Sequence, residues 1–361
     1  MSLERRPGIG QEGQFPERVP YAGNIRALRD IHVSDKGVLV RVDLDFKDGE
    51  EKTSRRFFAV KPTVKELEKH DVKRITILAH NGDYKSLRYL IKPLAELLQE
   101  DVAFTLDNST KSAEGRRVVL FENTRLCPEK REENNDPDFA AYMVEMGDTY
   151  VGNAFATSHR AHASIVGIPA LLKSKAVGLQ VEEEVNRIDE ALYRPKEGFI
   201  VVIGGAKIET KLPVIKYMAN IAETVLVGGI LPSEIEKEKI ILPDNVVVAQ
   251  LDKSLENKDI TLDSAEKFAK ILSKAKTIVW NGAMGVFEEH ETAQGTLIVV
   301  RAMVDAKSNN NAYLLAGGGE TEAFLKENNL EQPFNHISTG GGAMLEYVSG
   351  NKMPGLEVLR K

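Results

Sequence analysis

The 361-residue chain has almost no cysteine and no long apolar run. Cys127 is the single cysteine, which excludes an internal disulfide and a cysteine-rich metal cluster. No apolar stretch approaches the roughly 20 residues of a membrane-spanning helix, and the first residues lack the apolar core of a signal peptide. We therefore expect no membrane partner and a place in the reducing cytoplasm.

The chain also lacks a strong excess of one charge. It has 54 acidic and 48 basic residues, for a net charge of −6. Nothing in this balance favours binding to nucleic acid, so we expect no such partner, and any basic site must be local. The hydrophobic content of 42% is enough for full cores, and the length suits two domains.

The most informative stretch is FIVVIGGAKIETK, at residues 199–211. Five apolar residues predict a buried parallel strand, and Gly204 and Gly205 then allow a sharp turn close to a ligand. Lys207 and Lys211 follow at a spacing that would place them on one helix face. A strand, a glycine turn and a helix start with lysines are typical of phosphate binding. The alternative is a tight turn with two solvated lysines.

Glycine clusters recur through the second half of the chain, each after an apolar run. They are found at residues 228–229, 281–285, 317–321 and 338–343. Because the carboxyl ends of parallel strands share one edge of a sheet, such turns would gather around a ligand crevice. This repetition favours the phosphate-binding hypothesis over a structural turn.

Polar residues follow four apolar strands in the first half. Asp43, His80, Arg125 and Arg160 each come just beyond such a run. Several basic groups at one sheet edge would bind a small substrate with more than one negative charge. The alternative is a set of unrelated surface charges.

The rest of the chain alternates between apolar runs and amphipathic segments. We expect strands at residues 37–44, 74–79, 102–106, 118–121, 149–151, 199–203, 224–227, 246–248, 277–280 and 313–316. Val177, Val181, Val185, Ile188 and Leu192 recur at helical spacing and predict a hinge helix between the halves. The fold class is therefore α/β, with two doubly wound, Rossmann-like parallel-sheet domains and a cleft between them.

Several blocks of this sequence, in the same order, resemble those of the phosphoglycerate kinase family. They are residues 41–45 (RVDLD), 122–125 (ENTR), 154–164 (AFATSHRAHAS), 204–211 (GGAKIETK), 279–288 (VWNGAMGVFE), 317–321 (GGGET) and 336–343 (HISTGGGA). The resemblance covers nearly the whole chain from about Gly37 onward. It implies a two-domain hinge enzyme that transfers a phosphoryl group reversibly between 1,3-bisphosphoglycerate and MgADP, giving 3-phosphoglycerate and MgATP.

The resemblance also implies an organisation of the chain. Residues 1–176 would form the substrate domain and residues 177–194 the connecting helix. Separately from the resemblance, the prolines and glycines of residues 1–20 predict an irregular arm. Residues 195–345 would bind the nucleotide, and residues 346–361 would return to the N-terminal domain. The partners would be the small-molecule substrates, with ATP or ADP as co-substrate and Mg²⁺ as the metal, and we expect a monomer.

Site residues follow from the matched motifs. The substrate would be bound by Asp43, Asp45, Arg56, His80, Arg125 and Arg160. Arg56 looks like the arginine that reaches the transferred phosphoryl group, with Arg55 a close second. The nucleotide would be bound by Gly204, Gly205, Ala206, Lys207, Lys211, Gly228, Asn281, Gly285, Glu288, Gly317, Gly318, Gly319, Glu320 and Thr321. Glu288 would face the ribose and Glu320 the metal, and catalysis would rest on Arg56, Lys207, Gly341 and Gly342.

One departure from the family pattern falls beside the substrate site. Gly82-Asp83-Tyr84 stands where the family usually has Gly-Arg-Pro. Two unit charges about 4 Å apart interact by about 4 kcal/mol at an effective dielectric of about 20, so Asp83 cannot simply face a substrate phosphate. Either Asp83 turns away, with Lys85 or Arg88 in place of the usual arginine, or substrate binding is weakened.

Other departures concern the metal and the base. Asp45 and Asn153 stand where Asn and Asp are usual, and Ala283 replaces a proline. Glu320 keeps the charge of the usual Asp but is one methylene longer, which would shift Mg²⁺. The segment after Gly229 is short, which would thin the wall around the adenine and relax the nucleotide preference.

Two alternatives to the active kinase remain. The first is a catalytically impaired or substrate-shifted nucleotide- or metabolite-binding protein on the same fold. The second is a nicotinamide-dependent dehydrogenase, which has only the α/β alternation in its favour, because no GxGxxG follows the first strand.

Overall fold

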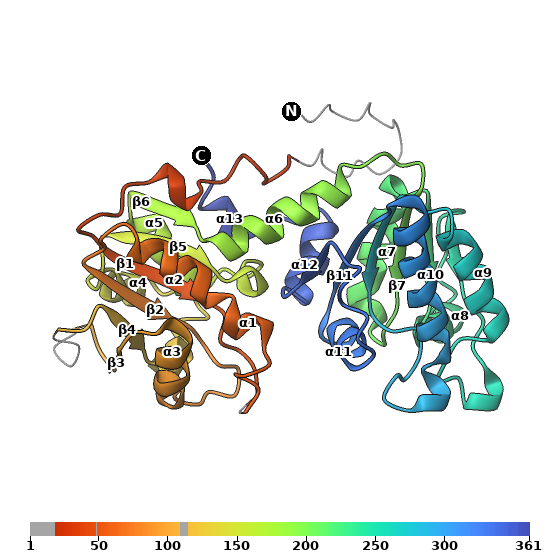
Figure 1. The fold of residues 1–361 in the computed structure, drawn as a ribbon, viewed down its shortest axis with the longest axis horizontal. Coiled ribbons are helices and arrows are strands. Elements are labelled where there is room, and N and C mark those ends of the chain that lie inside the picture. Colours follow the sequence, from red (N-terminus) through yellow and green to blue (C-terminus); the bar gives the residue numbers. More distant parts are fainter. Residues whose placement is uncertain (1–18, 48, 109–114) are drawn as a thin grey trace. The chain divides into compact units, whose positions relative to one another are not determined.

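The structure is a computed structural model, and it describes residues 19–47, 49–108 and 115–361 (Figure 1). The arm predicted for residues 1–20 lies almost wholly outside the described residues. The described chain divides into two compact units. The N-terminal unit comprises residues 20–186 and 352–361, and the C-terminal unit holds residues 187–351. The last ten residues therefore belong with the first half of the chain.

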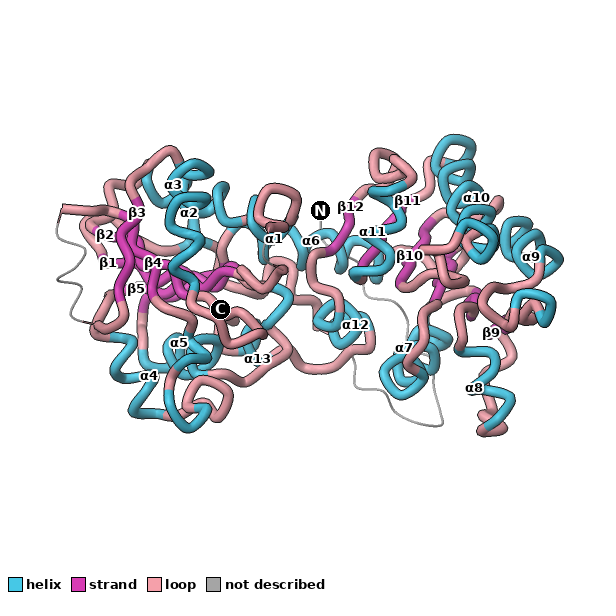
Figure 2. The backbone as a smooth tube through the Cα atoms, turned by 90° about the horizontal axis from the view of Figure 1, so that it is seen from below, coloured by secondary structure: helices cyan, strands magenta, loops and turns pink. Residues whose placement is uncertain are grey.

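The N-terminal unit is built around a six-stranded parallel sheet. Its strands are β1 (Gly37–Val42), β2 (Arg74–Leu78), β3 (Val102–Thr105), β4 (Val118–Phe121), β5 (Thr149–Asn153) and β6 (Ser174–Val177). They lie in the order β3-β4-β2-β1-β5-β6, and every pairing is parallel. β1 lies between β2 and β5 (Figure 2). It is buried along its whole length, as its apolar run predicts.

Amphipathic helices cover this sheet. They are α1 (Arg55–Phe58), α2 (Val60–Glu68), α3 (Ile91–Leu98), α4 (Pro137–Val144), α5 (Ile168–Leu171) and α13 (Pro354–Glu357). Short turns of other helix types lie at η1 (Leu28–Asp30), η2 (Leu87–Leu90), η4 (Thr124–Leu126), η5 (Pro128–Lys130), η6 (Phe155–Thr157) and η7 (Ala163–Gly167). Val38, Val40 and Val42 pack with apolar residues of α2 and α3 in one core.

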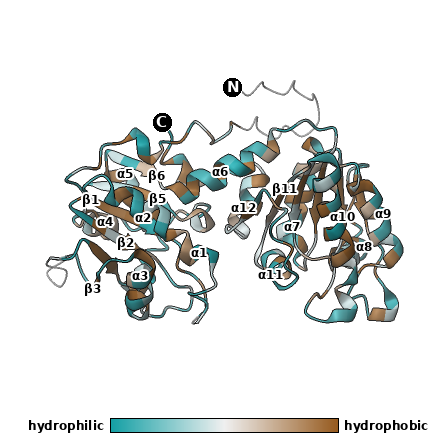
Figure 3. Ribbon diagram, in the orientation of Figure 1, coloured by the Kyte–Doolittle hydropathy of each residue, from teal (hydrophilic) through white to brown (hydrophobic). Residues whose placement is uncertain are grey.

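The C-terminal unit repeats the plan with a second six-stranded parallel sheet. Its strands are β7 (Phe199–Ile203), β8 (Thr224–Val227), β9 (Val246–Val248), β10 (Thr277–Asn281), β11 (Tyr313–Gly317) and β12 (His336–Ser338), in the order β12-β11-β10-β7-β8-β9. Its helices are α7 (Ile208–Ile221), α8 (Leu231–Lys237), α9 (Leu262–Leu272), α10 (Gln294–Asn310), α11 (Gly319–Glu327) and α12 (Gly342–Val348), with η8 (Lys253–Leu255) and η9 (His290–Thr292). In Figure 3 the strands are mostly coloured as hydrophobic, whereas the helices carry both hydrophobic and hydrophilic residues.

The predicted fold class is confirmed, with differences at three places. β6 and β12 were not predicted. Val177, assigned from its spacing to the connecting helix, ends β6 instead, and α6 (Leu179–Leu192) begins after it. Residues 346–351, predicted to return to the N-terminal domain, belong to the C-terminal unit.

Each sheet has one point at which the strand order reverses. In the N-terminal unit the chain extends from β1 towards β2 on one side and towards β5 on the other. In the C-terminal unit the same occurs between β7 and β10. Open parallel sheets bind ligands beyond the carboxyl ends of the strands at such reversal points. Asp43 follows β1 and Gly204 follows β7, so both units have candidate residues where the topology favours a ligand.

Candidate active site

A buried histidine surrounded by arginines lies beyond the carboxyl ends of β1 and β2. Arg41 Nη2 is 2.5 Å from His80 Nδ1, and Arg41 Nε donates to Ser164 Oγ at 2.8 Å. Both Arg41 and His80 are buried. Burial, followed by the positive charges of Arg41, Arg125 and Arg160, holds the pKa of His80 far below its usual range. His80 is therefore a neutral imidazole amid cations, which favours an anionic ligand nearby.

Asp43 orients Arg56 at the same sheet edge. Arg56 Nε lies 3.3 Å from Asp43 Oδ2, and Arg56 Nη1 donates to the Asp45 carbonyl oxygen at 2.8 Å. Burial raises the pKa of Asp43, and the positive charge of Arg56 opposes this shift. Arg56 is the member of the Arg55–Arg56 pair that the structure links to Asp43. We call Arg41, Asp43, Arg56, His80, Arg125 and Arg160 the basic site.

Asp45 binds the loop after β2, although its side chain is partly exposed. Its Oδ1 accepts from the Gly82 backbone N–H at 2.8 Å, and its Oδ2 is 3.9 Å from His80 Nε2. An added Cβ on Gly82 would lie 3.2 Å from Asp45 Oδ1 and 3.7 Å from Arg125 Nη1. The loop therefore brings Asp45, His80 and Arg125 together, although three different strands carry them.

Asp83 points away from this cluster. Its side chain is 69% exposed, and Oδ2 lies 3.8 Å from Lys85 Nζ. The Arg88 guanidinium instead lies over the Phe104 ring, 4.4 Å from its centroid. Of the two cations considered for the position of a missing arginine, only Lys85 is beside Asp83.

A buried glutamate positions Arg41 of the basic site through hydrogen bonds to Ser164. Glu132 is fully buried, and its Oε2 accepts from the Ser164 backbone N–H at 2.9 Å. The Ser164 hydroxyl donates to Glu132 Oε1 and accepts from Arg41, so Glu132 fixes Arg41 through one residue. His162 Nδ1 is 3.9 Å from the same carboxylate, and burial lowers the pKa of His162 to about 4.

Sequence reasoning missed both Arg41 and Glu132. Arg41 stands inside an apolar strand, and Glu132 lies in an irregular segment with other acidic residues. One signal was available. A charged residue within a buried run needs a partner, so Arg41 pointed to an acid elsewhere in the chain.

In the C-terminal unit, the loop after β7 packs tightly against the loop after β10. The Gly204 and Gly205 backbone N–H groups donate to the carbonyl oxygens of Asn281 and Ala283, both at 2.9 Å. A Cβ on Gly204 would lie 2.0 Å from the Ala283 oxygen, and Gly205 has φ of +90°. Glycine is therefore required at both positions.

The two lysines of the motif have different environments. Lys207 is exposed and occupies the N-cap position of α7, where its carbonyl oxygen accepts from the Lys211 backbone N–H at 3.3 Å. Lys211 is only 9% exposed, and its Nζ donates to Asn281 Oδ1. Burial lowers the pKa of Lys211 to about 8, and Glu320 opposes this shift. Asn281 Nδ2 in turn donates to the Gly317 carbonyl oxygen at 2.6 Å.

Two groups can be distinguished among the other predicted site glycines of the C-terminal unit. An added Cβ on Gly228 or Gly285 would collide with Met284 or with Asp259 and the Thr292 carbonyl oxygen. By contrast, nothing lies within 4 Å of a Cβ added to Gly319, Gly341 or Gly342. The second group leaves open backbone that a ligand can approach. We call the loops at residues 204–211, 281–285 and 317–321 the glycine-rich site.

Other predicted nucleotide residues differ in exposure. The Thr321 hydroxyl is buried and accepts from the Gly282 backbone N–H at 2.8 Å. By contrast, four of them are exposed: Ala206, Glu288, Gly319 and Glu320. Gly318 lies beside Asn281 and has a φ of +106°, a backbone conformation that favours glycine.

Comparison with known proteins identifies the family. The sequence matches the family model described as phosphoglycerate kinase over residues 28–239 and 231–351. It is 33% identical to the phosphoglycerate kinase of Lactiplantibacillus plantarum and 35% identical to that of Lacticaseibacillus casei, in each case over 92% of this chain and 98% of the relative. The chain belongs to the phosphoglycerate kinase family.

Solved phosphoglycerate kinase structures agree in fold. That from Pyrococcus horikoshii superposes with a TM-score of 0.77 at 29% identity, and that from Coxiella burnetii with 0.76 at 25% identity. Each comparison covers 93% of this chain and 98% of the other. Within the described part of the chain, no helix is both long and apolar enough to cross a membrane.

Membership in the phosphoglycerate kinase family fixes the reaction class. The family transfers a phosphoryl group reversibly between 1,3-bisphosphoglycerate and ADP, giving 3-phosphoglycerate and ATP. The match over nearly the whole chain favours this glycolytic kinase over the impaired or substrate-shifted binding protein, and over a dehydrogenase.

Proposed function

We propose that the basic site binds 3-phosphoglycerate and 1,3-bisphosphoglycerate, and that the glycine-rich site binds ATP and ADP. The observation that carries this assignment is the neutral His80 surrounded by Arg41, Arg125 and Arg160 at the strand-order reversal of the first sheet. Several fixed cations around one uncharged hydrogen-bonding ring suit a small substrate with a carboxylate and a phosphate.

Individual roles in the basic site follow from the contacts. Arg56, oriented by Asp43, neutralises charge on the transferred phosphoryl group. Arg125 and Arg160 bind the substrate phosphate, and His80 with Asp45 contacts its carboxylate end. Phosphoryl transfer depends on position and electrostatic stabilisation more than on a covalent nucleophile, so these residues need only hold and neutralise the substrate.

Roles in the glycine-rich site rest on open backbone and on two lysines. Lys207 and Lys211 bind nucleotide phosphates, and the backbone at Gly205 and Gly319 approaches them closely. Of the remaining predicted residues, Ala206, Gly228, Asn281, Gly285, Gly317, Gly318 and Thr321 shape these loops. Glu288 faces the ribose, and Gly341 with Gly342 meets the transferred group.

The carboxylate of Glu320 fits Mg²⁺ only as part of a nucleotide complex. Among the residues that the structure describes, no group of three or more His, Cys, Asp and Glu side chains is placed to hold a metal. Mg²⁺ keeps several waters and is commonly bound through one or two carboxylates together with substrate phosphates. Glu320 is exposed in the first turn of α11, where it supplies one such ligand. Mg²⁺ would neutralise phosphate charge there.

The direct test is turnover of the purified protein with 3-phosphoglycerate and MgATP, coupled to a dehydrogenase that consumes the product. Arg56→Ala and Lys207→Ala should each lower kcat by about 10²- to 10³-fold, as loss of a group that stabilises transition-state charge does. Lys267→Ala, an exposed lysine of α9, serves as the control. Absence of turnover in the unmodified chain, with clear MgADP binding by calorimetry, would contradict the assignment of the basic site.

Assembly and location complete the proposal. We expect a monomer in the cytoplasm that uses only small-molecule partners, neither nucleic acid nor membrane. Light scattering of the purified chain at working concentration measures the first point, and a mass near twice 40.0 kDa would overturn it.

A further inference from the structure

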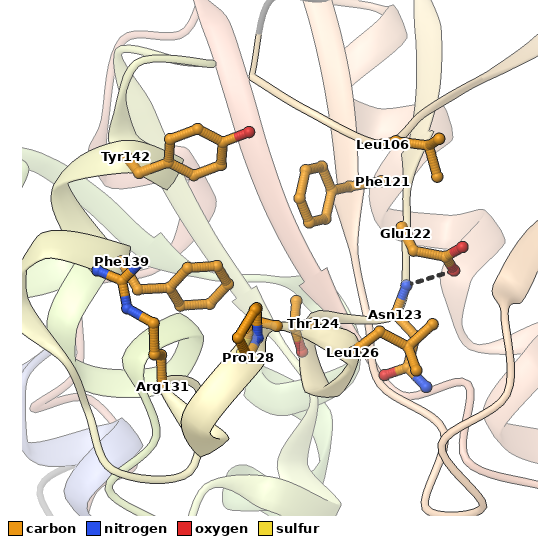
Figure 4. A pocket seen from close by; sticks show the side chains of 11 residues that line it. Leu106, Phe121, Glu122, Asn123, Thr124, Leu126, Pro128, Arg131, Phe139 and Tyr142 are labelled. Atoms are coloured by element: carbon orange, nitrogen blue, oxygen red, sulfur yellow. Dashed lines mark hydrogen bonds between the residues drawn. The ribbon is translucent and has the colours of Figure 1, made fainter.

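The neighbours of Arg125 in the chain line a cavity that Arg125 itself does not line. This cavity of about 290 Å³ lies between β4 and α4 (Figure 4). Its wall includes Thr124 and Leu126 but not Arg125. The Arg125 side chain lies instead beside the loop after β2 and beside Glu133, whose Oε1 is 3.5 Å from Arg125 Nε. A ligand of the Arg125 guanidinium would therefore be bound at the basic site and not in this cavity.

Arg125 and Glu133 lie next to each other without a hydrogen bond between Nε and the carboxylate. Their side chains are 11% and 17% exposed. Arg125 Nε and Glu133 Oε2 are both buried, and neither has a hydrogen-bond partner within residues 19–47, 49–108 and 115–361. An arginine and a carboxylate this close commonly form a pair at about 2.7–2.9 Å, often through two parallel hydrogen bonds. Each side chain therefore has hydrogen-bonding capacity that either the other one or a substrate can use.

Tyr84 contacts both members of this pair. Its hydroxyl donates to Glu133 Oε1 at 2.9 Å, the same oxygen that lies 3.5 Å from Arg125 Nε. The guanidinium carbon of Arg125 is 5.9 Å from the centroid of the Tyr84 ring, near the ~6 Å limit of a cation–π contact. The hydrogen bond, followed by the charge of Glu133, raises the pKa of Tyr84, so the hydroxyl remains a donor at neutral pH. It thus occupies the carboxylate oxygen that Arg125 would otherwise use.

A tight turn holds Tyr84 in this position. Its φ is +55°, in the left-handed region that bulky residues rarely adopt. The Tyr84 N–H donates to the Asn81 carbonyl oxygen at 3.2 Å, and the Asp83 N–H donates to Asn81 Oδ1 at 2.8 Å. Proline, which the family usually has at this position, has no hydroxyl and a φ fixed near −65°. The usual Gly-Arg-Pro segment therefore could not supply the contact that Tyr84 makes with Glu133.

We propose that Tyr84 is a positioning residue for substrate binding: it keeps the Glu133 carboxylate from pairing with Arg125, and so leaves the guanidinium available for the phosphate of 3-phosphoglycerate. This inference rests on the proposed binding of that substrate at the basic site. Glu133 is then an internal anion that competes with the substrate for Arg125. Without the Tyr84 hydroxyl, the carboxylate closes on the guanidinium, and the substrate has to displace it.

Three variants test the proposal in the coupled assay. Tyr84→Phe keeps the ring and removes the hydroxyl. It should raise the KM for 3-phosphoglycerate about fivefold, the effect of about one net hydrogen bond, and leave kcat and the KM for MgATP unchanged. Glu133→Gln removes the competing charge and should lower the KM for 3-phosphoglycerate about two- to fivefold. The double variant should match Glu133→Gln, because the hydroxyl has no carboxylate left to hold.

Two matched controls separate this local effect from a general one. Tyr89→Phe removes the hydroxyl of another exposed tyrosine, in η2. Glu129→Gln removes one negative charge at an exposed position four residues before Glu133. Both should leave the KM for 3-phosphoglycerate within about twofold of its value in the unmodified chain, as is usual for surface changes.

Arg125→Ala distinguishes failure of this inference from failure of the proposed substrate site. If Arg125→Ala does not raise the KM for 3-phosphoglycerate, the assignment of Arg125 to the substrate is wrong, and the role of Tyr84 is overturned with it. If Arg125→Ala does raise that KM, three results still overturn the inference alone. They are a Tyr84→Phe chain whose KM does not rise, a Glu133→Gln chain whose KM does not fall, and an effect of Tyr84→Phe that persists in the double variant.

Discussion

Burial gives Lys211 a charge that changes within an accessible pH range. Its pKa is lowered to about 8, from an ordinary value of 10.5. Between these values the unfolded chain binds more protons than the folded one, so the free energy of unfolding rises with pH. We predict that this group adds up to about 3 kcal/mol between pH 8 and 10.5. Urea unfolding of the unmodified chain and of Lys211→Met across this range should give curves that diverge by that amount.

Nucleotide binding should respond to pH in the opposite sense. Loss of the Lys211 charge weakens the attraction for phosphate, so MgADP affinity should fall over the interval in which stability rises. The opposite slopes distinguish titration of Lys211 from general alkaline unfolding. Parallel unfolding curves for the two chains would show that the lysine keeps an ordinary pKa.

The exposed position of Asp83 predicts that its charge matters little for the substrate. Exposed ion pairs contribute roughly 0–1 kcal/mol, and salt screens a carboxylate that points into solvent. Asp83→Asn should change the KM for 3-phosphoglycerate by no more than about twofold, whereas Arg125→Ala should raise it at least tenfold. A tenfold lower KM in Asp83→Asn, measured in the coupled assay, would mean that the carboxylate faces the substrate.

Residues predicted from the sequence share one property. Asp43, His80 and Arg125 stand one, two and four residues after apolar strands, and the end of a strand limits where the next side chains lie. Arg41 was not predicted as a site residue because it lies within such an apolar run. Glu132 was not predicted because it lies in a segment without helical or strand periodicity. Their pairing is a tertiary contact between residues 41, 132 and 164, which no local pattern encodes.

At the scale of elements, apolar runs were predictable even when short, as at β9, and strands of mixed polar and apolar composition were not. β7 and β10 each present five buried residues in sequence. β12 has three residues and begins with a half-buried histidine, and β6 begins with two half-buried residues. Such edge strands form because neighbouring strands offer hydrogen bonds, so their own composition is a weak signal.

The two groups of glycine predict different effects of alanine. Gly204→Ala places a Cβ 2.0 Å from the Ala283 carbonyl oxygen, so it should lower the stability of the C-terminal unit by about 3 kcal/mol or more. Gly319→Ala and Gly342→Ala meet nothing within 4 Å and should leave stability unchanged. If the open backbone binds phosphate, these two should still weaken turnover.

Thermal unfolding and MgADP calorimetry on the three variants separate the cases. A stable Gly204→Ala chain would mean that the loops after β7 and β10 move apart readily. Full activity in both Gly319→Ala and Gly342→Ala would remove these positions from the nucleotide site.

At the scale of the whole molecule, residues 352–361 belong to the same unit as residues 20–186. The Gly355 backbone N–H donates to the Ser158 carbonyl oxygen at 2.9 Å, and the Met353 N–H donates to the Tyr21 hydroxyl at 3.2 Å. Leu356 and Leu359 are buried. The N-terminal unit therefore cannot complete its core until the last ten residues have been synthesised, although they follow residues 187–351 of the C-terminal unit.

This connectivity predicts which unit a C-terminal change destabilises. Leu356→Ala should lower the stability of the N-terminal unit by about 2–5 kcal/mol, because it leaves a cavity at a position that is 1% exposed. Under the proposed assignment of the two sites, 3-phosphoglycerate would stabilise only the N-terminal unit and MgADP only the C-terminal unit, so calorimetry with each ligand assigns the affected transition. Lys352→Ala, exposed and nearby, is the matched control. If Leu356→Ala lowered only the transition that MgADP raises, residues 352–361 would be stabilising the C-terminal unit, against their hydrogen bonds to Tyr21 and Ser158.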